Sequence, residues 1–199
     1  ISFDVQKGEF LGIMGSSGAG KSTLLNCIST IDSVSAGKII LDGKEVNLLK
    51  DKMLARFRRE NLGFIFQDFS LLDNLTIYDN IALALTINNV PTDVIKKKVE
   101  HVAKQLGIYE ILQHYPYETS GGQKQRCACA RAIINEPKLV LADEPTGNLD
   151  SKTELEVISM LKSCVSEYGQ TLVMITHDET IAQMADRMIV IEDGKVVRA

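Results

Sequence analysis

The sequence contains no tryptophan, only four prolines and no long apolar run. No stretch approaches the roughly 18 to 20 uncharged residues that a helix needs to cross a bilayer, and residues 1–4 lack the basic and apolar regions of a signal peptide. An excess of positive charge is also absent, since 22 basic and 26 acidic residues give a formal net charge of -4. With no basic field to hold a nucleic-acid backbone, we expect no nucleic-acid partner. The lack of a membrane span and of a signal peptide leads us to expect a cytoplasmic chain.

Cysteine is scarce as well, and the four cysteines form no C-x-x-C pair. Cys127 and Cys129 lie two residues apart in a predicted helix, so they point to different faces and cannot both bind one metal ion. We therefore expect no zinc site. We interpret these two residues, with Cys27 and Cys164, as small buried packing residues in a reducing compartment.

The remaining composition is that of one globular domain. Of the 199 residues, 45% are hydrophobic and 24% are charged. Near the start, Ile1, Phe3 and Val5 alternate with polar residues, which predicts an edge strand, and a second strand is predicted over residues 9–14. Because natural domains seldom begin inside a sheet, we expect a segment of the native protein to precede residue 1.

Short strands and a turn are predicted in the next part of the chain. A helix over about residues 21–29 is followed by strands over 38–41 and 62–67, with a turn at Asp42-Gly43. We interpret these strands as a small mixed sheet.

A helical segment begins near Leu75. In its clearest helix, Thr92 is the predicted N-cap, Gly107 is the predicted stop, and one face is lined by Ile95, Val99, Val102 and Leu106. The run Lys96-Lys97-Lys98 is either a basic patch or the solvated face of this helix, and we favour the solvated face.

Helices and strands alternate beyond Ser120. The pattern predicts a helix to about residue 135, another over about 151–168, a short third helix, and apolar strands over 139–142, 172–176 and 188–191. A final turn is predicted at Asp193-Gly194. Such alternation is typical of a parallel sheet covered by helices, so we predict an α/β fold.

A phosphate-binding motif lies between the second predicted strand and the first predicted helix. The pattern G-x-x-x-x-G-K-[ST] of a P-loop is matched by Gly15, Ser16, Ser17, Gly18, Ala19, Gly20, Lys21 and Ser22. Its backbone N–H groups and the N-terminus of the following helix favour a phosphate. We expect Lys21 to reach the outer phosphates of a nucleotide, Ser22 to bind Mg2+, and Thr23 to be a second phosphate contact. A glycine-rich turn with an incidental lysine is the alternative.

Two carboxylates follow the apolar strand at residues 139–142. Ligands of open α/β sheets collect at the carboxyl ends of strands, where Asp143, Glu144 and the P-loop all fall. We assign Asp143 to the Mg2+ shell and Glu144 as general base for the attacking water. His177 follows another apolar strand and reaches the same edge, where its role is either a γ-phosphate contact or a structural one.

A second glycine-lined helix start occurs at Ser120-Gly121-Gly122-Gln123, about a hundred residues after the first. From these four residues alone, we favour a plain glycine turn over a second anion-binding helix end.

The motifs together, in this order, resemble the ABC ATPase family. The resemblance rests on the P-loop, on Ser120–Gln123 followed by Lys-Gln-Arg, and on the sequence Ala-Asp-Glu-Pro-Thr-Gly-Asn-Leu-Asp at residues 142–150, and it spans essentially the whole chain. It implies one nucleotide-binding domain with a P-loop NTPase core of parallel strands and helices, an antiparallel β subdomain and a helical subdomain. The P-loop and β part would cover about 1–67, the helical subdomain about 68–135 and the catalytic core strands about 136–199.

The resemblance also implies roles that the motifs alone leave open. In the family, the Ser-Gly-Gly-Gln helix of one subunit caps the γ-phosphate of ATP held on the P-loop of the other. Ser120, Gly121 and Gly122 would therefore act in trans in a head-to-tail dimer, with Gln123 in the same nucleotide-contacting segment. Further implied roles are a glutamine that senses Mg2+ and the attacking water, a switch histidine and a loop residue at the dimer interface, which are Gln67, His177 and Asp150.

Two departures from the family pattern concern the packing before Ser120 and the residue that stacks on the adenine ring. Thr119 stands where the family usually has Leu or Ile, which should alter local packing more than phosphate contact. The family stacks adenine on an aromatic residue upstream of the P-loop, and this chain begins too late to contain a clear candidate.

The resemblance is closest to one branch of the family. Residues 29–32, 57–59 and 62–68 resemble the macrolide-exporter and lipoprotein-release branch, and within it the bacitracin-resistance-type subunits. This implies an ATPase that uses Mg2+ and ATP, lies on the inner face of the cell membrane through a permease, and serves antimicrobial peptide export, resistance or sensing. The family also implies a permease groove at residues 67–78, with Phe69, Leu71 and Leu72, although core packing is the competing explanation for these side chains.

Three other functions remain to be weighed. One is a soluble ABC protein of DNA repair or translation. A long coiled-coil insertion or a second cassette would favour this function, and neither occurs in this sequence. A binding module that uses ATP only as a signal would bind without turnover. A simple P-loop kinase leaves Ser120–Gln123 unexplained.

Overall fold

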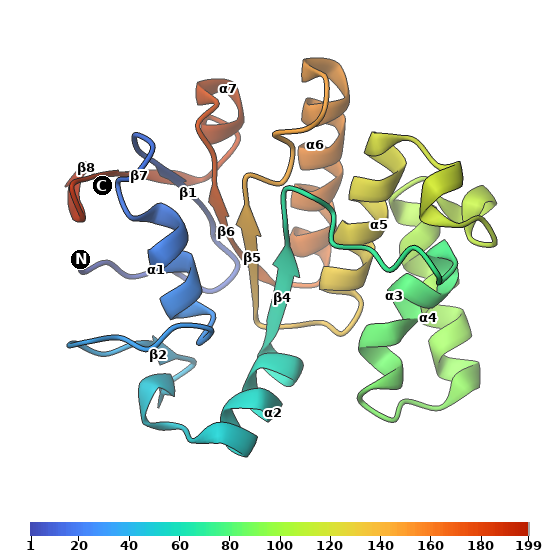
Figure 1. Cartoon of the computed structure of the whole chain (residues 1–199), viewed down its shortest axis with the longest axis horizontal. Coiled ribbons are helices and arrows are strands. Elements are labelled where there is room, and N and C mark those ends of the chain that lie inside the picture. The colour runs from blue at the N-terminus through green and yellow to red at the C-terminus, as the bar shows by residue number, and fades with distance from the viewer. Residues whose placement is uncertain (199) are drawn as a thin grey trace.

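The computed structural model describes residues 1–198, apart from the side chain of residue 51. Its strands and helices form one twisted sheet with helices on both faces and a helical region at one end (Figure 1). The strands are β1 (Phe10–Met14), β2 (Ile40–Leu41), β3 (Lys44–Glu45), β4 (Leu62–Ile65), β5 (Leu139–Asp143), β6 (Thr171–Ile175), β7 (Arg187–Glu192) and β8 (Lys195–Arg198). The helices are α1 (Lys21–Ile28), α2 (Asp51–Asn61), α3 (Ile77–Thr86), α4 (Thr92–Gln105), α5 (Gly121–Ile133), α6 (Ser151–Glu167) and α7 (Glu179–Ala182), with short 3-10 turns at Val46–Leu48, Tyr109–Ile111 and Pro116–Glu118.

The main sheet has six strands in the order β4-β5-β6-β1-β7-β8. All neighbours pair in parallel except β7 and β8, which form an antiparallel hairpin at one edge. Strands β5 and β6 are buried along almost their whole length, which explains why they read as continuous apolar runs. The predicted parallel sheet covered by helices is confirmed, as is the turn at Asp193-Gly194, where both residues have positive φ.

The predicted small mixed sheet is wrong. Within residues 1–198, only β2 and β3 form a separate sheet, an antiparallel hairpin joined by the predicted turn at Asp42-Gly43. The strand predicted over residues 62–67 is β4, which pairs in parallel with β5 in the main sheet. The amphipathic helix α2 separates β4 from the hairpin, and the buried apolar residues of β4 find their partner in β5 instead.

The predicted edge strand at the start is also wrong, because no strand is present over residues 1–9. The alternation instead reflects packing, since Phe3 and Val5 pack against buried residues of the core. The backbone there is held by a side chain, because the Arg187 guanidinium donates a hydrogen bond to the carbonyl oxygen of Asp4.

The helical region contains α3, α4 and α5, which pack on one another. In α4 the predicted face is buried, Lys96 and Lys97 are exposed as expected of a solvated face, and Gly107 has φ +65 just after the helix ends. The predicted N-cap at Thr92 is wrong by one residue. Pro91 caps the helix, because its carbonyl oxygen already accepts hydrogen bonds from the amides of Val94 and Ile95, both at 3.0 Å.

Two hydrophobic clusters lie on opposite faces of the sheet. Alternate residues of β5 point into each, so that Val140 packs with the helical region and α6, while Leu141 packs with α1 and α2. Three of the four cysteines, Cys127, Cys129 and Cys164, are buried in the larger cluster, and burial raises the pKa of the Cys127 thiol to about 12. These three are packing residues as predicted, whereas Cys27 is half-buried. Within residues 1–198, no helix is long and apolar enough to span a membrane.

Gly63 tests how closely β4 and α5 approach. A Cβ atom added there would lie 2.3 Å from the carbonyl oxygen of Ala132, a rigid backbone atom in α5. We expect Gly63→Ala to lower the free energy of unfolding by about 1–3 kcal/mol, because the helix must shift away from the sheet. Urea unfolding followed by circular dichroism measures this change.

Gly169→Ala is the comparison, because Gly169 has φ +61 but open space around the added carbon. Its cost should be limited to the backbone term of about 1 kcal/mol. Equal stability of Gly63→Ala and the unaltered protein would contradict the close contact.

Candidate nucleotide-binding site

The P-loop connects β1 to α1 at the carboxyl edge of the sheet. A Cβ atom at Gly15 would lie 2.2 Å from the carbonyl oxygen of Ile191, so only glycine fits where the loop crosses β7. Gly18 and Gly20 have φ of +80 and +96, with nothing within 4 Å of an added carbon. The loop is thereby tight against the sheet on one side and open on the other, which is the shape that a phosphate needs.

Lys21 lies across this loop. Its ammonium Nζ donates hydrogen bonds to the carbonyl oxygens of Gly15 at 2.8 Å and Ser16 at 2.9 Å. The charge is therefore held above the loop, at the N-terminus of α1, where an anion would also meet the positive end of the helix dipole.

A cavity of about 390 Å³ lies over the loop. Glu144 and His177, at the ends of β5 and β6, reach it from neighbouring strands, and the other residues that line it are Gly15, Ser17, Gly18, Gly20, Lys21, Ser22 and Thr23. Ser16 and Ala19 complete the loop, with the Ala19 amide donating to the Ser16 carbonyl at 3.2 Å. A cavity over a glycine-rich loop, with the Lys21 ammonium group and backbone amides as hydrogen-bond donors, fits a nucleoside triphosphate.

The carboxylates of Asp143 and Glu144 have different surroundings. Burial raises the pKa of Asp143, while a hydrogen bond with Ser22 and the charge of Lys21 oppose this shift. A hydroxyl and a carboxylate side by side at a phosphate site suit Mg2+, which prefers oxygen ligands and whose charge would keep Asp143 ionised.

Glu144 projects towards His177. It has φ +44, a left-handed conformation that non-glycine residues rarely adopt, and its amide donates to the carbonyl oxygen of Ile175 at 3.0 Å. Its carboxylate oxygen Oε2 lies 3.3 Å from Nδ1 of His177. The main chain thus fixes Glu144 in a pose that a free peptide would avoid, and the histidine contacts its carboxylate.

Gln67 is not in the lining of the cavity described above. Its side-chain nitrogen Nε2 is 3.0 Å from where a Cβ of Gly147 would be, so it packs on the loop that follows Glu144. The same loop holds the Gln67 backbone, because the Asn148 side chain donates to the Gln67 carbonyl oxygen at 3.0 Å.

The Ser120–Gln123 segment begins α5 with a capping box. The Gln123 amide donates to the Ser120 hydroxyl at 3.3 Å, and the Ser120 amide donates to the Gln123 side chain at 2.9 Å. A Cβ atom at Gly122 would lie 2.6 Å from the methyl of Thr153, at the start of α6. The plain glycine turn is therefore excluded as a description, since these residues cap a 13-residue helix.

The structure does not bring this helix end to the P-loop of the same chain, because the cavity lining described above includes none of residues 120–123. Asp150 also lies apart from the cavity and caps α6, with its carboxylate accepting from Thr153. The hydrogen bonds from Thr153 lower the pKa of Asp150. Thr119 donates to the Pro116 carbonyl at 2.8 Å, which is a local packing role as expected.

Two polar residues near the site escaped the sequence analysis. Arg131 and Asn148 both donate to carbonyl oxygens of the loop that contains Gln67. Asn148 lies inside a quoted motif, but its hydrogen-bond partner is 81 positions away in the chain. No pattern in the sequence indicates either contact, because both depend on how α5 and β5 pack beside β4.

Comparison with known proteins identifies the fold. The family model described as ABC transporter matches residues 1–147, which include the P-loop, Ser120–Gln123 and the paired carboxylates. The chain belongs to the ABC transporter family. It is accordingly an ATP-hydrolysing subunit that uses Mg2+ with ATP, and the predicted ABC ATPase fold is confirmed.

Relatives of this ABC subunit extend over almost its whole length. The bacitracin export ATP-binding protein BceA of Halalkalibacterium halodurans is 50% identical over 196 residues, which are 98% of this chain and 78% of BceA. The uncharacterized ABC transporter ATP-binding protein YvcR of Bacillus subtilis is 50% identical over 195 residues, which are 98% of this chain and 75% of YvcR.

A solved structure is also similar to this ABC subunit. The ATP-binding cassette MJ0796, in a dimeric post-hydrolysis state bound to ADP and Pi, is 38% identical with a TM-score of 0.88. The superposition covers 98% of this chain and 86% of that chain.

Lys21 provides a direct test of ATP binding. We expect Lys21→Met to weaken ATP binding by at least about tenfold, because a charge-assisted hydrogen bond to phosphate contributes roughly 1.5–3 kcal/mol. Titration with a fluorescent ATP analogue measures the change. Lys104→Met is the matched control, since Lys104 lies over the Tyr109 ring and not at the P-loop. The affinity of this variant for ATP should be unaltered. Equal affinities of the two variants would contradict the role of Lys21.

Proposed function

We propose that this ABC subunit powers a membrane permease for antimicrobial peptide export, resistance or sensing. The observation that carries its chemistry is the convergence of the P-loop, Glu144 and His177 on one cavity. Support for the peptide branch comes from BceA, whose name describes bacitracin export. The subunit would lie on the cytoplasmic face of the membrane through that permease.

The cavity residues, together with Asp143 and Gln67 outside its lining, have proposed tasks. Lys21 and the P-loop amides hold the phosphates, and Thr23 adds a contact. Ser22 and Asp143 would hold Mg2+, and Gln67 would contribute a further contact to it. Bound Mg2+ neutralises phosphate charge and so favours the reaction. Glu144 accepts a proton from the attacking water, whose oxygen bonds to the γ-phosphorus as the bond between the γ-phosphorus and ADP breaks. His177 contacts the γ-phosphate and orients Glu144.

A second copy of the chain would complete the site. Ser120 caps α5 at an exposed position, outside the cavity of its own chain, so its anion-binding helix end is available to the nucleotide of another copy. The dimeric MJ0796 cassette supports this arrangement by likeness. We therefore propose that Ser120, Gly121, Gly122 and Gln123 contact ATP in trans, and that Asp150 lies at the dimer interface.

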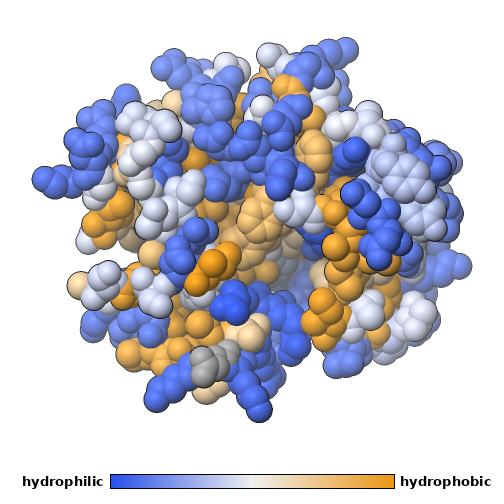
Figure 2. Space-filling view, in the orientation of Figure 1, coloured by the Kyte–Doolittle hydropathy of each residue, from blue (hydrophilic) through white to orange (hydrophobic). Residues whose placement is uncertain are grey.

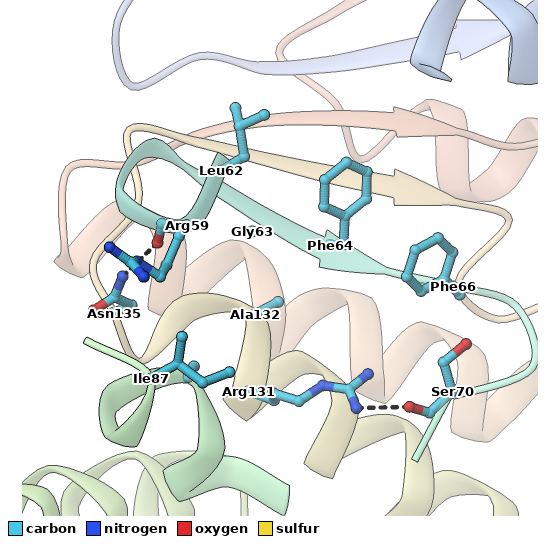
Figure 3. Close-up of a pocket in the computed structure, with 11 residues that line it drawn as sticks. Arg59, Leu62, Gly63, Phe64, Phe66, Ser70, Ile87, Arg131, Ala132 and Asn135 are labelled. Atoms are coloured by element: carbon cyan, nitrogen blue, oxygen red, sulfur yellow. Dashed lines mark hydrogen bonds between the residues drawn. The ribbon is translucent and has the colours of Figure 1, made fainter. Parts of the chain in front are cut away.

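The permease would dock in a different cleft. A cavity of about 390 Å³ opens between β4 and the helical region, in the hollow where Figure 2 shows apolar surface. Its labelled residues come from β4, α5 and neighbouring segments (Figure 3). The lining is Arg59, Leu62, Gly63, Phe64, Phe66, Ser70, Ala84, Ile87, Arg131, Ala132 and Asn135. An apolar side chain from a short permease helix suits this lining, which includes the stacked rings of Phe64 and Phe66.

This cleft differs from the groove expected at residues 67–78. Among those residues only Ser70 lines it. Leu71 packs against the larger core cluster, so core packing is the correct explanation for that side chain, while Leu72 is 44% exposed. The proposed groove therefore moves from the loop itself to the strand and helix on either side.

Glu144→Gln tests the catalytic proposal. The amide cannot accept the proton of the attacking water, so we expect steady-state ATP turnover to fall by roughly a hundredfold or more. With ATP and Mg2+ this variant should also elute as a dimer in size-exclusion chromatography, because uncleaved ATP stays between the two copies. Single-turnover assays of the unaltered protein distinguish an ATPase from a module that only binds ATP. Undiminished turnover in Glu144→Gln would contradict the assigned base.

Ile87 tests the docking cleft. It is 50% exposed and lies in the lining. In a protein with Cys27 replaced by serine, we expect Ile87→Cys to crosslink to the copurified permease. Leu155→Cys, on α6 and 40% exposed, is the matched control and should not crosslink. Crosslinking at Leu155 alone would place the permease elsewhere.

A further inference from the structure

A strained turn follows Gln67. Phe69 has φ +63 and Ser70 has φ +47, both in the left-handed region that favours glycine. Residues with a Cβ stay in this region only when their surroundings hold them there, and such residues gather at functional sites. Few main-chain contacts stabilise this turn, the shorter of them being the 2.7 Å hydrogen bond from the Ser70 amide to the Asp68 carbonyl. Another group must therefore hold it.

That group is the guanidinium of Arg131, which reaches across from α5. It donates to the carbonyl oxygen of Ser70 at 2.6 Å and to that of Phe69 at 3.1 Å (Figure 3 shows the first bond). A planar guanidinium is suited to two neighbouring acceptors in a way that a lysine ammonium is not. Burial lowers the pKa of Arg131, because the charged group has lost part of its water. The two carbonyl oxygens are the hydrogen-bond partners that it has in this position.

The other end of the same loop is also anchored. Asn148 donates to the Gln67 carbonyl, and the Gln67 side chain packs on Gly147, in the loop after Glu144. Gln67 therefore lies between two fixed points, one on the loop that carries the general base and one on α5. The main chain on either side of the Gln67 side chain is thus held in place.

We propose that Arg131 is a positioning residue for Gln67. By holding the left-handed turn at Phe69 and Ser70, it keeps the Gln67 amide beside the loop of Glu144, ready for Mg2+ and the attacking water. Because α5 begins at Ser120–Gln123, Arg131 also ties the helix end that contacts ATP in trans to the residue that acts on ATP in cis. This inference rests on the function proposed above for Gln67.

A double-mutant cycle tests the proposal on the full-length protein, purified with its membrane partner. We expect Arg131→Met and Gln67→Ala each to lower kcat by about tenfold, while ATP affinity changes by less than about twofold, because positioning and not nucleotide binding is lost. Both variants should need more Mg2+ for half-maximal turnover. The combined variant should have a kcat within about twofold of Gln67→Ala alone, since Arg131 acts through Gln67.

Arg126→Met is the matched control. Arg126 lies on the same helix, but it contacts the Leu106 carbonyl and Glu156, and its kcat and Mg2+ dependence should stay within about twofold of the unaltered protein. A second variant covers the case in which Arg131→Met folds poorly. Ser70→Gly relieves the strained residue, so adding it to Arg131→Met should recover part of the lost kcat, which a purely structural loss elsewhere would not permit.

The outcomes separate the two levels of inference. If Gln67→Ala keeps full activity, the role of Gln67 in the proposed function fails, and the role of Arg131 fails with it. If Gln67→Ala is impaired but the two losses multiply in the combined variant, only the positioning role of Arg131 is overturned. A kcat of the combined variant equal to that of Gln67→Ala, with partial rescue by Ser70→Gly, supports the proposal.

Discussion

The parallel pairing of β1, β5 and β6 is the constraint on which the site depends. Parallel neighbours end at the same edge, so the P-loop after β1, the carboxylates at the end of β5 and the histidine after β6 are brought together there. The pairing in turn depends on burial from both sides, with alternate residues of each strand facing the helical region or α1. The stability of the core and the geometry of catalysis therefore have one origin.

The sequence predicted what local chemistry determines. The P-loop, the strand that ends in Asp143-Glu144 and the capped helix at Ser120 each have a signal within a few residues, and each occurs where expected. The errors lie where pairing partners decide the outcome. Strand β4 was assigned to the wrong sheet, because an apolar run such as Leu62–Ile65 does not indicate whether its neighbour is the hairpin or β5. Likewise, the alternation at Ile1, Phe3 and Val5 predicts a strand, but no neighbouring strand pairs with it.

The candidate site follows the same division. The motif residues that line the cavity were predicted from the sequence, whereas the residues that hold these motifs in place were not. Arg131 and Asn148 donate hydrogen bonds to backbone carbonyl oxygens. Because every residue has a backbone carbonyl, the sequence does not indicate which residue accepts such a bond. The left-handed φ values of Glu144, Phe69 and Ser70 could not be predicted from the sequence either, because none of these positions is a glycine. At these three positions the strain is held by tertiary contacts, which the local sequence does not encode.

Gly122 has a mechanical consequence. Because no side chain separates it from Thr153, the first turn of α5 rests directly on the first turn of α6, where Asp150 and Thr153 are joined by hydrogen bonds. Close-packed segments transmit displacement to each other, so we expect a molecule that pushes on one helix tip to shift the other as well.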